Sequence, residues 1–417
     1  MIGTLRKEAG RSIVVGGGVS GLLAALRLAQ KGQTVELYES RERLGGLIET
    51  RVLRHGLAED AAHSLRASAA VRGLFAELGL DWVSAKPEAR AKFLIRNGRL
   101  RKWPFGVFET LSALFHATLA PAGNRDAHLA EWAKRHLGGA APAMRAMARG
   151  IYGSEPEELV ARLAFPKIAP DPLWPLLPWV LRTKREKGIV AAAARKGMGD
   201  LIRALENKAR TCGVAFHLGV PVPRDLVDPI LRGSDTKSNL ILTAPPDACA
   251  RLVASADEDL GNRLEAVPYG ALTCVTALID AKAFAHPPVG TGALSMDRGD
   301  SRILGILYNS SSFAGRVLDE QVARSLTLML RGAEPPTRAE LCAILAASFD
   351  LPESALLEYA IAAHPRALPR YGLPLEAAWN HCRRFCAAHP GLVFFGNWTG
   401  EISLRGLIET ARNFSTP

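Results

Sequence analysis

Ser12-Ile13-Val14-Val15-Gly16-Gly17-Gly18-Val19-Ser20-Gly21 is the stretch that decides the fold of this chain of 417 residues. A short run that favours a strand leads into a G-x-G-x-x-G turn, and Leu22 to Lys31 then predicts a helix. In this pattern Gly16 permits a tight turn, Gly18 lets the backbone approach a diphosphate, and Gly21 lets the helix pack closely on the strand. The amides at the start of the helix would face the phosphates. The stretch therefore predicts a dinucleotide-binding unit.

The continuation of the chain narrows the choice of dinucleotide. A second predicted strand, Thr34 to Tyr38, ends at Glu39, where an acceptor for ribose hydroxyls is expected, and this carboxylate disfavours the phosphorylated ribose of NADP. The next segment, Arg41 to Gly46, ends in paired glycines that would let a second piece of backbone approach the cofactor. It resembles the flavoproteins that include amine oxidases, phytoene desaturases and protoporphyrinogen oxidases. The resemblance implies FAD.

Length and composition set the broad class. A chain of 417 residues, 48% of them hydrophobic, exceeds what one core usually supports, so two or three domains are expected. The net charge of +11 suggests anionic partners, whether phosphates, carboxylates, acidic lipids or nucleic acid. Because no nucleic-acid motif accompanies the charge, nucleic acid is not predicted as a partner.

Cysteine usage and the N-terminus indicate a reduced compartment. The six cysteines are dispersed without a C-x-x-C motif, so neither a disulfide framework nor a metal site is predicted. His381 to His389 is expected to be a helix with ordinary side chains. Met1 to Arg11 lacks the apolar core of a signal peptide, and no apolar run is long enough for a transmembrane helix. We expect a cytoplasmic protein, with peripheral contact to the cytoplasmic face of the inner membrane as an open question.

Two segments raise that question of membrane contact. Arg99 to Phe108 sets cations and aromatic residues ahead of an apolar helix that carries Leu111, Leu114, Phe115 and Leu119. Leu173 to Leu181 is apolar with two tryptophans and runs into Arg182, Lys184, Arg185 and Lys187. Both resemble interfacial elements, in which apolar surface meets acyl chains and cations meet headgroups. The alternative is that the aromatic residues pack inside a helical domain and the charges form its solvated face.

The order of patterns along the chain predicts an α/β fold with a discontinuous cofactor domain. We expect a Rossmann-like FAD-binding domain, of the type found in glutathione-reductase-like flavoproteins, to be assembled from residues 1–63, 195–251 and 389–417. Residues 64–194 are predicted to be a helical domain that could contact a membrane and admit substrate, and residues 252–388 an α+β substrate-binding domain. Predicted elements include strands at 214–218, 239–242, 273–279, 303–308, 326–330 and 392–398, with helices at 201–211 and 402–413.

Three further segments make the resemblance more specific. Gly150 to Leu159, Ile303 to Phe313 and His364 to Tyr371 resemble segments of the oxygen-dependent protoporphyrinogen oxidases, and the likeness extends over nearly the whole chain. The resemblance implies that non-covalent FAD contacts Gly16, Gly17, Gly18, Val19, Ser20, Gly21, Glu39, Ser40, Arg43, Gly45, Gly46, Leu47, Ala61, Ala62, His63, Ser64, Val222, Ala244, Gly396, Asn397, Ile402, Ser403 and Leu404.

The same resemblance implies a tetrapyrrole substrate with carboxylate arms. Leu294 and Met329 match a pair that clamps the macrocycle, and Phe93 would lie nearby. Lys92 falls where the family has a propionate-binding arginine, and His63 and Arg66 are further candidates near the flavin edge. The chain departs from the family pattern at Lys92, at Arg370, where glutamine is usual, at Glu401, where glycine is common, and at Gly406, which replaces an acid. These departures put the identity of the substrate in doubt, and the binding of a flavin less so.

The reaction implied by the resemblance is the six-electron oxidation of a porphyrinogen, protoporphyrinogen IX or coproporphyrinogen III, to the porphyrin in heme synthesis. Hydride passes from bridging methylenes to flavin N5 in three rounds, so no side chain is assigned a catalytic role. A second nucleotide motif is missing from the sequence, which favours O2, or alternatively a quinone, as the acceptor. Two other interpretations stay open: a flavin oxidase of amines or another apolar substrate, and a flavin-binding protein without turnover.

Overall fold

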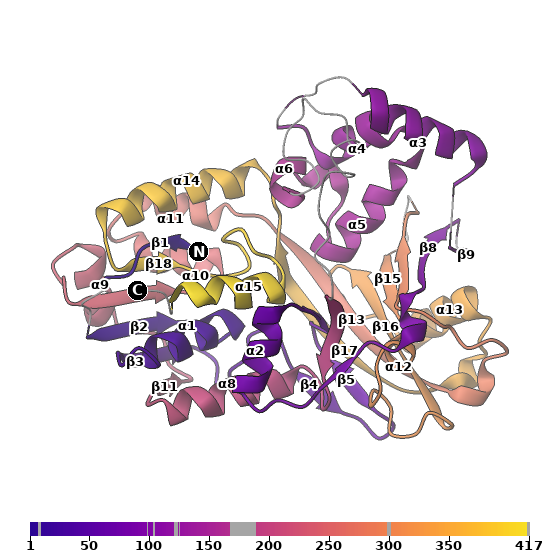
Figure 1. Ribbon diagram of the computed structural model, residues 1–417, viewed down its shortest axis with the longest axis horizontal. Coiled ribbons are helices and arrows are strands. Elements are labelled where there is room, and N and C mark those ends of the chain that lie inside the picture. The colour runs from indigo at the N-terminus through magenta and orange to yellow at the C-terminus, as the bar shows by residue number, and fades with distance from the viewer. Residues whose placement is uncertain are drawn as a thin grey trace.

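The computed structural model describes residues 1–6, 10–97, 99–102, 105–120, 124, 126–166, 189–297 and 302–414 (Figure 1). Within these residues, the first large sheet has its strands in the order β1-β18-β12-β2-β3-β11, and all neighbours are parallel except β1 and β18. Its strands are β1 (Ile2–Gly3), β2 (Arg11–Val15), β3 (Thr34–Glu39), β11 (Ala215–Leu218), β12 (Ser238–Leu242) and β18 (Leu392–Phe394). Segments from the start, the middle and the end of the chain thus meet in one sheet.

Helices cover both faces of this sheet, as a mostly parallel sheet requires. The face that carries Val14 and Leu37 packs against α1 (Val19–Ala29), α8 (Gly199–Thr211) and α15 (Leu404–Ala411). The face that carries Ile13 and Leu240 packs against α9 (Arg224–Leu231), α10 (Pro246–Val253), α11 (Glu258–Glu265) and α14 (Leu373–Ala388). The predicted strands and helices of this region are confirmed, although the strand expected at 392–398 ends at Phe394. The α/β fold class is also confirmed.

The second large sheet has its described strands in the order β17-β13-β16-β15-β14-β8-β9, antiparallel except for the pair β14 and β8. Its strands are β8 (Lys92–Arg96), β9 (Arg99–Arg101), β13 (Tyr269–Asp280), β14 (Gly292–Ser295), β15 (Ile303–Leu307), β16 (Ala323–Arg331) and β17 (Leu356–Pro369). Helix α13 (Arg338–Phe349) closes one face over Ala293, Ile306 and Leu328. The opposite face is turned toward α5 and the β4–β5 hairpin.

Smaller elements connect the two sheets. Strands β4 (Thr50–Val52) and β5 (Leu57–Glu59) form a hairpin, and β6 (Leu65–Ala67), β10 (Val190–Ala194) and β7 (Trp82–Ser84) form a three-stranded sheet. Helix α2 (Ala69–Glu77) packs against α15, and the short α12 (Asn309–Ser312) packs against β16. The guanidinium of Arg51 on the hairpin donates to the carbonyl of Ile361 on β17 at 3.0 Å. The hairpin therefore ties the first sheet to the second.

A group of helices stands above the second sheet in Figure 1: α3 (Val107–Leu119), α4 (Leu129–Leu137), α5 (Pro142–Tyr152) and α6 (Ala161–Ala164). The stretch 64–194, expected to be helical, also contributes strands β6 to β10, and β8 and β9 join the second sheet. The domain boundaries themselves stay a prediction. In the described part of the chain, no helix has both the length and the apolar character needed to cross a membrane. The segment Leu173 to Leu181, its basic continuation, and Trp103 and Pro104 lie outside the described residues.

Candidate functional site

The glycine turn joins β2 to α1 and holds an open space in front of the helix. Gly16 has a φ of +108°, a conformation that favours glycine. A Cβ at Gly21 would lie 1.8 Å from the carbonyl oxygen of Gly16, so only glycine lets α1 approach β2 this closely. A Cβ at Gly18, in contrast, would meet nothing nearer than the Cα of Gly46, at 4.0 Å. Gly18 therefore borders space that the protein itself leaves unfilled.

A second turn completes the wall of this space. The amide of Gly45 donates to the carbonyl of Gly17 at 2.8 Å, and Gly45 and Gly46 have φ values of +104° and +61°. The guanidinium of Arg43 holds the turn from outside, donating to the carbonyl of Gly46 at 3.0 Å. Leu47 follows the turn and is half-buried. The two glycine turns are thus in direct backbone contact, since a Cβ at Gly46 would lie only 3.3 Å from the Cα of Gly18, and the unfilled space lies beside Gly18.

Glu39 lies at the end of β3 beside the first turn. Its carboxylate accepts from the amide of Gly17 at 2.6 Å and from the amide of Arg41 at 3.0 Å, with the hydroxyl of Ser40 at 3.4 Å. The segment that leads to Val222 runs alongside, because the amide of Val220 donates to the carbonyl of Glu39 at 3.3 Å. Ser40 is also at the surface of this region. The position of the carboxylate suits an acceptor for hydroxyl groups of a ligand in the turn.

Two further strand ends meet at the same edge of the sheet. Strands β12 and β18 run parallel to β2, so Ala244 and Gly396 follow at the carboxyl edge where ligands of such sheets bind. The indole of Trp398 donates to the carbonyl of Ala244 at 3.1 Å, and the hydroxyl of Tyr371 donates to the carbonyl of Asn397 at 2.7 Å. Ile402, Ser403 and Leu404 lead into α15, and the hydroxyl of Ser403 caps it by accepting from the amide of Gly406 at 3.1 Å. The residues near the end of the chain that are predicted to contact FAD thus lie at this edge of the sheet.

Glu401 and Gly406, two of the departures from the family pattern, lie next to each other in the structure. A Cβ at Gly406 would lie 2.0 Å from Oε2 of Glu401. The carboxylate of Glu401 therefore takes the room that a side chain at position 406 would fill, close to the N-terminus of α15. A negative charge at a helix N-terminus is favourable.

The segment Ala61 to Ser64 follows the hairpin and carries a half-buried histidine. The Nε2 atom of His63 is buried without a hydrogen-bond partner. Burial, and secondly the nearby Arg316, lower the pKa of His63 to about 4, so the imidazole is neutral at pH 7. Arg66 lies on β6 with its side chain exposed. A neutral ring with an unpartnered nitrogen fits a hydrogen bond to a bound ligand.

The state of His63 gives a testable pH dependence. Because its pKa is below the value of 6.5 for an exposed histidine, the folded protein disfavours the charged ring, and this stability is lost as pH falls from about 6.5 toward 4. We expect the free energy of unfolding in urea to fall more steeply over this range in the parent protein than in His63→Asn. The exposed His128→Asn serves as control and should keep the parent slope. Equal slopes in all three proteins would contradict the buried, neutral state.

Beside His63 lies a buried ion pair that the sequence did not indicate. The carboxylate of Glu59 accepts from Arg316 at 3.0 Å, from the hydroxyl of Thr50 at 2.6 Å and from the amide of Met198 at 2.9 Å. Arg316 also donates to the carbonyl of Ala194 at 2.9 Å. Both side chains of the pair are at most 4% exposed. The pair joins β5, the start of α8 and the loop after α12 around the predicted cofactor edge.

Four of the predicted substrate residues lie on the second sheet, and they fall on its two different faces. Leu294 on β14 lies opposite Gly305 on β15, which lies opposite Met329 on β16, which lies opposite Cys274 on β13. Because directly opposed residues point to the same face, these side chains form one row, which we call the Leu294 row. A Cβ at Gly150 of α5 would lie 2.7 Å from Leu294, so α5 covers the β14 end of the row.

Lys92 and Phe93 alternate along β8 and so point to opposite faces. Lys92 pairs with Gly292, two residues from Leu294, and shares the face of the Leu294 row with its side chain exposed. Phe93 pairs with Ala293 and packs with Tyr308 in the core under α13, with ring centroids 6.3 Å apart. The expectation that Phe93 lies near the clamping pair is thereby corrected, since the sheet separates them.

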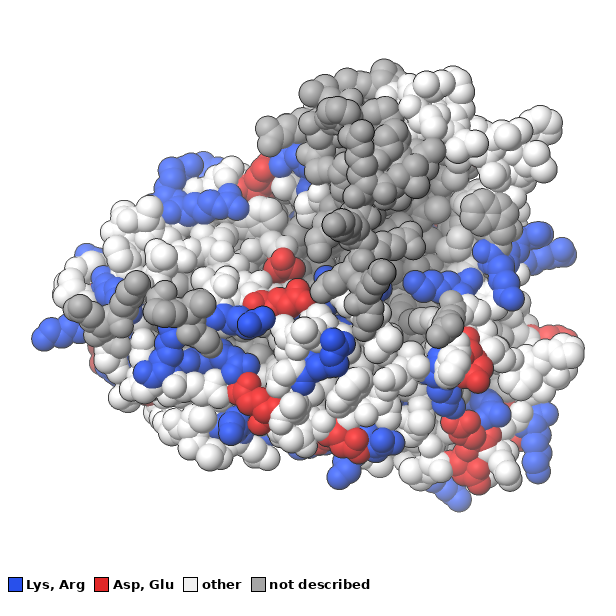
Figure 2. Space-filling model, in the orientation of Figure 1, with Lys and Arg blue, Asp and Glu red and all other residues white. Residues whose placement is uncertain are grey.

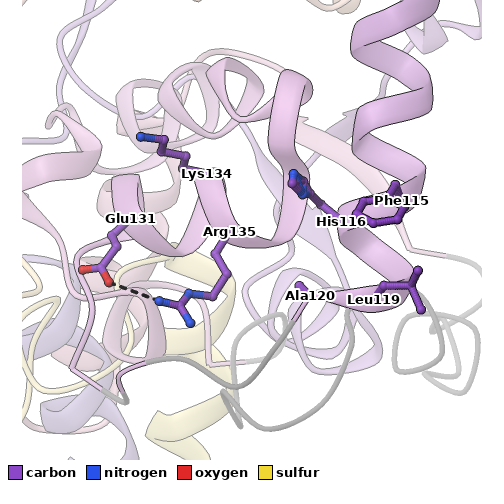
Figure 3. Close-up of a pocket in the computed structure, with 7 residues that line it drawn as sticks. All are labelled: Phe115, His116, Leu119, Ala120, Glu131, Lys134 and Arg135. Atoms are coloured by element: carbon purple, nitrogen blue, oxygen red, sulfur yellow. Dashed lines mark ion pairs between the residues drawn. The ribbon is translucent and has the colours of Figure 1, made fainter.

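A cavity of about 420 Å³ lies elsewhere, between α3 and α4. Figure 3 shows its lining residues, with apolar side chains from α3 on one side and the ion pair of Glu131 and Arg135, 3.7 Å apart, on the other. They are Phe115, His116, Leu119, Ala120, Glu131, Lys134 and Arg135. None of them belongs to the glycine turns or to the Leu294 row, so this cavity is separate from the candidate site.

The fold and the glycine turns define a protein with a Rossmann-like dinucleotide-binding domain. Residues 14–78 match the NAD(P)-binding Rossmann-like domain. The structure is similar to UDP-galactopyranose mutase, with a TM-score of 0.75, 15% identity and coverage of 97% of this chain and 94% of that one. It is also similar to cyclohexylamine oxidase from Brevibacterium oxydans, with a TM-score of 0.68, 16% identity and coverage of 98% of both chains.

More particularly, the chain is similar to protoporphyrinogen oxidases over nearly its whole length, which confirms the resemblance read from its sequence. It is 27% identical to the protoporphyrinogen oxidase of Macaca fascicularis, over 97% of both proteins. It is 24% identical to the chloroplastic protoporphyrinogen oxidase of Oryza sativa, over 96% of this chain and 86% of the relative. It is 26% identical to the coproporphyrinogen III oxidase of Propionibacterium freudenreichii, over 85% of this chain and 77% of the relative.

Proposed function

We propose that the protein is an FAD-dependent porphyrinogen oxidase acting in heme synthesis. The observation that carries the proposal is the similarity to protoporphyrinogen oxidases over 97% of both chains. The relatives include enzymes named for protoporphyrinogen and for coproporphyrinogen III, and we include both as substrates. O2 is the proposed electron acceptor, with a quinone as the alternative.

The residues at the carboxyl edge of the first sheet fit FAD. The unfilled space beside Gly18 leaves room for the diphosphate, the start of α1 offers it amide groups, and Glu39 accepts from ribose hydroxyls. The unpartnered Nε2 of His63 is available to the flavin end. When bound, FAD would supply the hydride acceptor for oxidation of the bridging methylenes. In this proposal the cofactor is bound without a covalent link.

The face of the Leu294 row is the proposed place for the macrocycle. Leu294 and Met329 offer apolar contacts and are half-buried, while Lys92 on the same face offers a positive charge to a carboxylate. Lysine holds a carboxylate as a point charge, without the two-pronged geometry of arginine. His63 and Arg66 stay candidates at the cofactor edge. The task of these residues is to position the substrate and exclude water.

An anaerobic mixing experiment tests the function. Addition of protoporphyrinogen IX or coproporphyrinogen III to the oxidised protein should bleach the flavin absorbance, and porphyrin fluorescence should appear. Readmission of air should restore the yellow colour. Bleaching by amines but not by porphyrinogens would support an amine oxidase instead, and absence of bleaching with any of them would indicate flavin binding without turnover.

The amine oxidase interpretation rests on the likeness to cyclohexylamine oxidase in fold. An amine oxidase needs aromatic side chains facing the flavin to hold the amine. In the described part of the chain, the Leu294 row consists of Leu294, Gly305, Met329 and Cys274, which are not aromatic. The row therefore favours a flat apolar substrate over a small cation.

We also propose that the helical region touches a lipid surface, with the protein otherwise in the cytoplasm. Helix α3 has no buried side chain, and Val107, Phe108 and Leu119 are 74%, 87% and 65% exposed. Arg99, Arg101 and Lys102 of the β9 segment are exposed below it, and Figure 2 shows cations in this area next to an uncharged surface. Apolar surface beside cations suits the boundary of an anionic bilayer.

Substitutions on α3 test this contact. In Phe108→Ser/Leu111→Ser/Phe115→Ser, binding to vesicles that contain phosphatidylglycerol should fall by tenfold or more, because three exposed apolar side chains are removed. The exposed Leu357→Ser on β17 provides a control that should bind like the parent. Flotation of vesicles with the protein measures binding. If the parent protein does not float with any vesicle, the proposed membrane contact is wrong, but the proposed oxidase activity is not affected.

A further inference from the structure

Three arginines converge on one carboxylate between α5 and the second sheet. Glu155 accepts from Arg145 and Arg149 of α5 and from Arg331 at the end of β16. The side chain of Arg149 is 1% exposed, whereas that of Arg331 is 42% exposed. The single negative charge of Glu155 thus faces three positive charges. The most exposed of the three arginines is Arg331, which lies on the second sheet.

The two arginines of α5 have additional partners that fix them in place. Arg145 also forms an ion pair with Glu157 at 3.0 Å, and Arg149 donates to the carbonyl of Asp297 at 2.8 Å. In the part of the chain that the structure describes, the guanidinium of Arg331 has Glu155 as its ion-pair partner. If Arg331 exchanged Glu155 for another anion, Glu155 would keep two guanidinium partners. Arg331 is therefore the member of the cluster that can bind a ligand at the lowest cost.

The register of the sheet places Arg331 beside the candidate site. Arg331 lies two residues after Met329 on β16 and so shares the face of the Leu294 row. It is opposite Leu272 on β13, which is opposite His364 on β17. Two strand spacings give about 10 Å between the backbones of Arg331 and His364. The ring of His364 is 2.8 Å from the carbonyl of Asp60, the residue before Ala61 of the proposed cofactor contacts.

We propose that Arg331 binds a carboxylate of the substrate and so helps to determine specificity, with Glu155 as its resting partner. The inference rests on the proposed function. Lys92 lies on the same face, separated from Arg331 by the strands β14 and β15 and by the apolar side chains of the Leu294 row. Helix α5 covers the Leu294 end of the row, so the apolar side chain beside Arg331 that a flat macrocycle with carboxylate arms would contact is that of the half-buried Met329. The fork of Arg331 supplies the two-pronged contact that Lys92 lacks.

The alternative role for Arg331 is structural, as a tie between the helical region and the sheet. A tie would contribute to stability and would not distinguish a porphyrin acid from its ester. Binding of product porphyrins to the flavin-containing protein separates the two roles, because it needs no turnover. We choose protoporphyrin IX, coproporphyrin III and protoporphyrin IX dimethyl ester as probes, followed by quenching of tryptophan fluorescence.

The variants are Arg331→Met and Arg331→Lys, with Arg263→Met as a matched control. Arg263 is ion-paired with Asp259 at 2.9 Å and is 43% exposed, so its loss changes the net charge equally on a surface outside the site. For Arg331→Met we expect the dissociation constants of both free acids to rise roughly tenfold or more, since a charge-assisted hydrogen bond is lost. The dimethyl ester should bind as it does to the parent. Arg331→Lys should recover part of the affinity, and Arg263→Met should match the parent.

Two results would overturn the assignment of Arg331 and leave the oxidase standing. They are unchanged affinity of Arg331→Met for the free acids, and an equal loss of affinity for acids and ester. Circular dichroism and flavin content show whether Arg331→Met is folded. If it is not, Arg331→Lys is measured in its place. Affinity of Arg331→Lys for the free acids equal to that of the parent would contradict a bidentate contact by Arg331. Failure of the parent protein to bind any porphyrin would instead remove the proposed function, and the role of Arg331 with it.

Discussion

Gly18→Val will yield a folded protein that does not retain flavin. A Cβ at position 18 meets no protein atom closer than 4.0 Å, and Gly18 has a φ of −71°, so the backbone at this position accepts a valine without strain. The side chain will instead occupy the unfilled space beside Gly18, which the diphosphate must enter to reach the amides of α1. We expect near-complete loss of the flavin absorbance band from the purified variant, with an unchanged circular dichroism spectrum.

Two other glycines supply the controls for this experiment. A Cβ at Gly73 in α2 would have no atom within 4 Å, so Gly73→Ala should stay folded and yellow. Gly21→Ala places its methyl 1.8 Å from the carbonyl oxygen of Gly16, so it should damage folding itself. The three variants distinguish a blocked cofactor site from a packing defect. A fully loaded, yellow Gly18→Val protein would contradict the assignment of the glycine turn.

The glycine turn was predictable because its chemistry lies in contiguous residues. A strand, three glycines, a helix and Glu39 follow one another within 30 residues, and the amide of Gly17 indeed donates to Glu39 at 2.6 Å. Local sequence therefore contains all of the geometry. The same holds for the strands of the second sheet whose apolar runs are long, such as β13 and β16.

The other parts of the candidate site depend on pairings between distant residues. Which face Phe93 presents is decided by the parallel pairing of β8 with β14, about 200 positions later in the chain. Glu155 and Arg331 are 176 residues apart, and Glu59 and Arg316 are 257 apart. No local pattern marks such partners, since an isolated arginine in a sequence usually belongs to the solvated surface. Sequence reasoning could propose the kinds of residue needed, but register and packing decided where they lie.

Arg316→Met is the second variant for which we expect a large effect, here on stability. The methionine fills the space of the arginine stem but leaves the carboxylate of Glu59 buried without its cation. Removing one partner of a buried pair typically costs about 3–5 kcal/mol. Urea unfolding should show a loss of that order. Arg210→Met, which breaks an exposed pair with Glu206, provides the control and should lose less than about 1 kcal/mol.

The double variant Glu59→Gln/Arg316→Met tests whether the loss comes from the unpaired charge. Glutamine carries no charge; its oxygen in place of Oε1 can accept from the amide of Met198, and its NH2 group in place of Oε2 can donate to the hydroxyl oxygen of Thr50. The double variant should therefore be more stable than Arg316→Met alone, although it carries a second substitution in the core. If it is less stable, the loss in Arg316→Met reflects packing around the methionine instead of the buried, unpaired charge.

The pH dependence of Arg316→Met follows from the same carboxylate. Burial raises the pKa of Glu59 above its ordinary value, while Thr50, Met198 and Arg316 oppose that rise. Without Arg316 the pKa of Glu59 must rise further, so the folded variant keeps its proton to a higher pH than the unfolded chain does. Stability then increases as pH falls through the pKa of the folded state. We expect Arg316→Met to gain stability relative to the parent as the pH is lowered from the alkaline side, and a difference between the two proteins that does not change with pH would contradict a buried, charged Glu59.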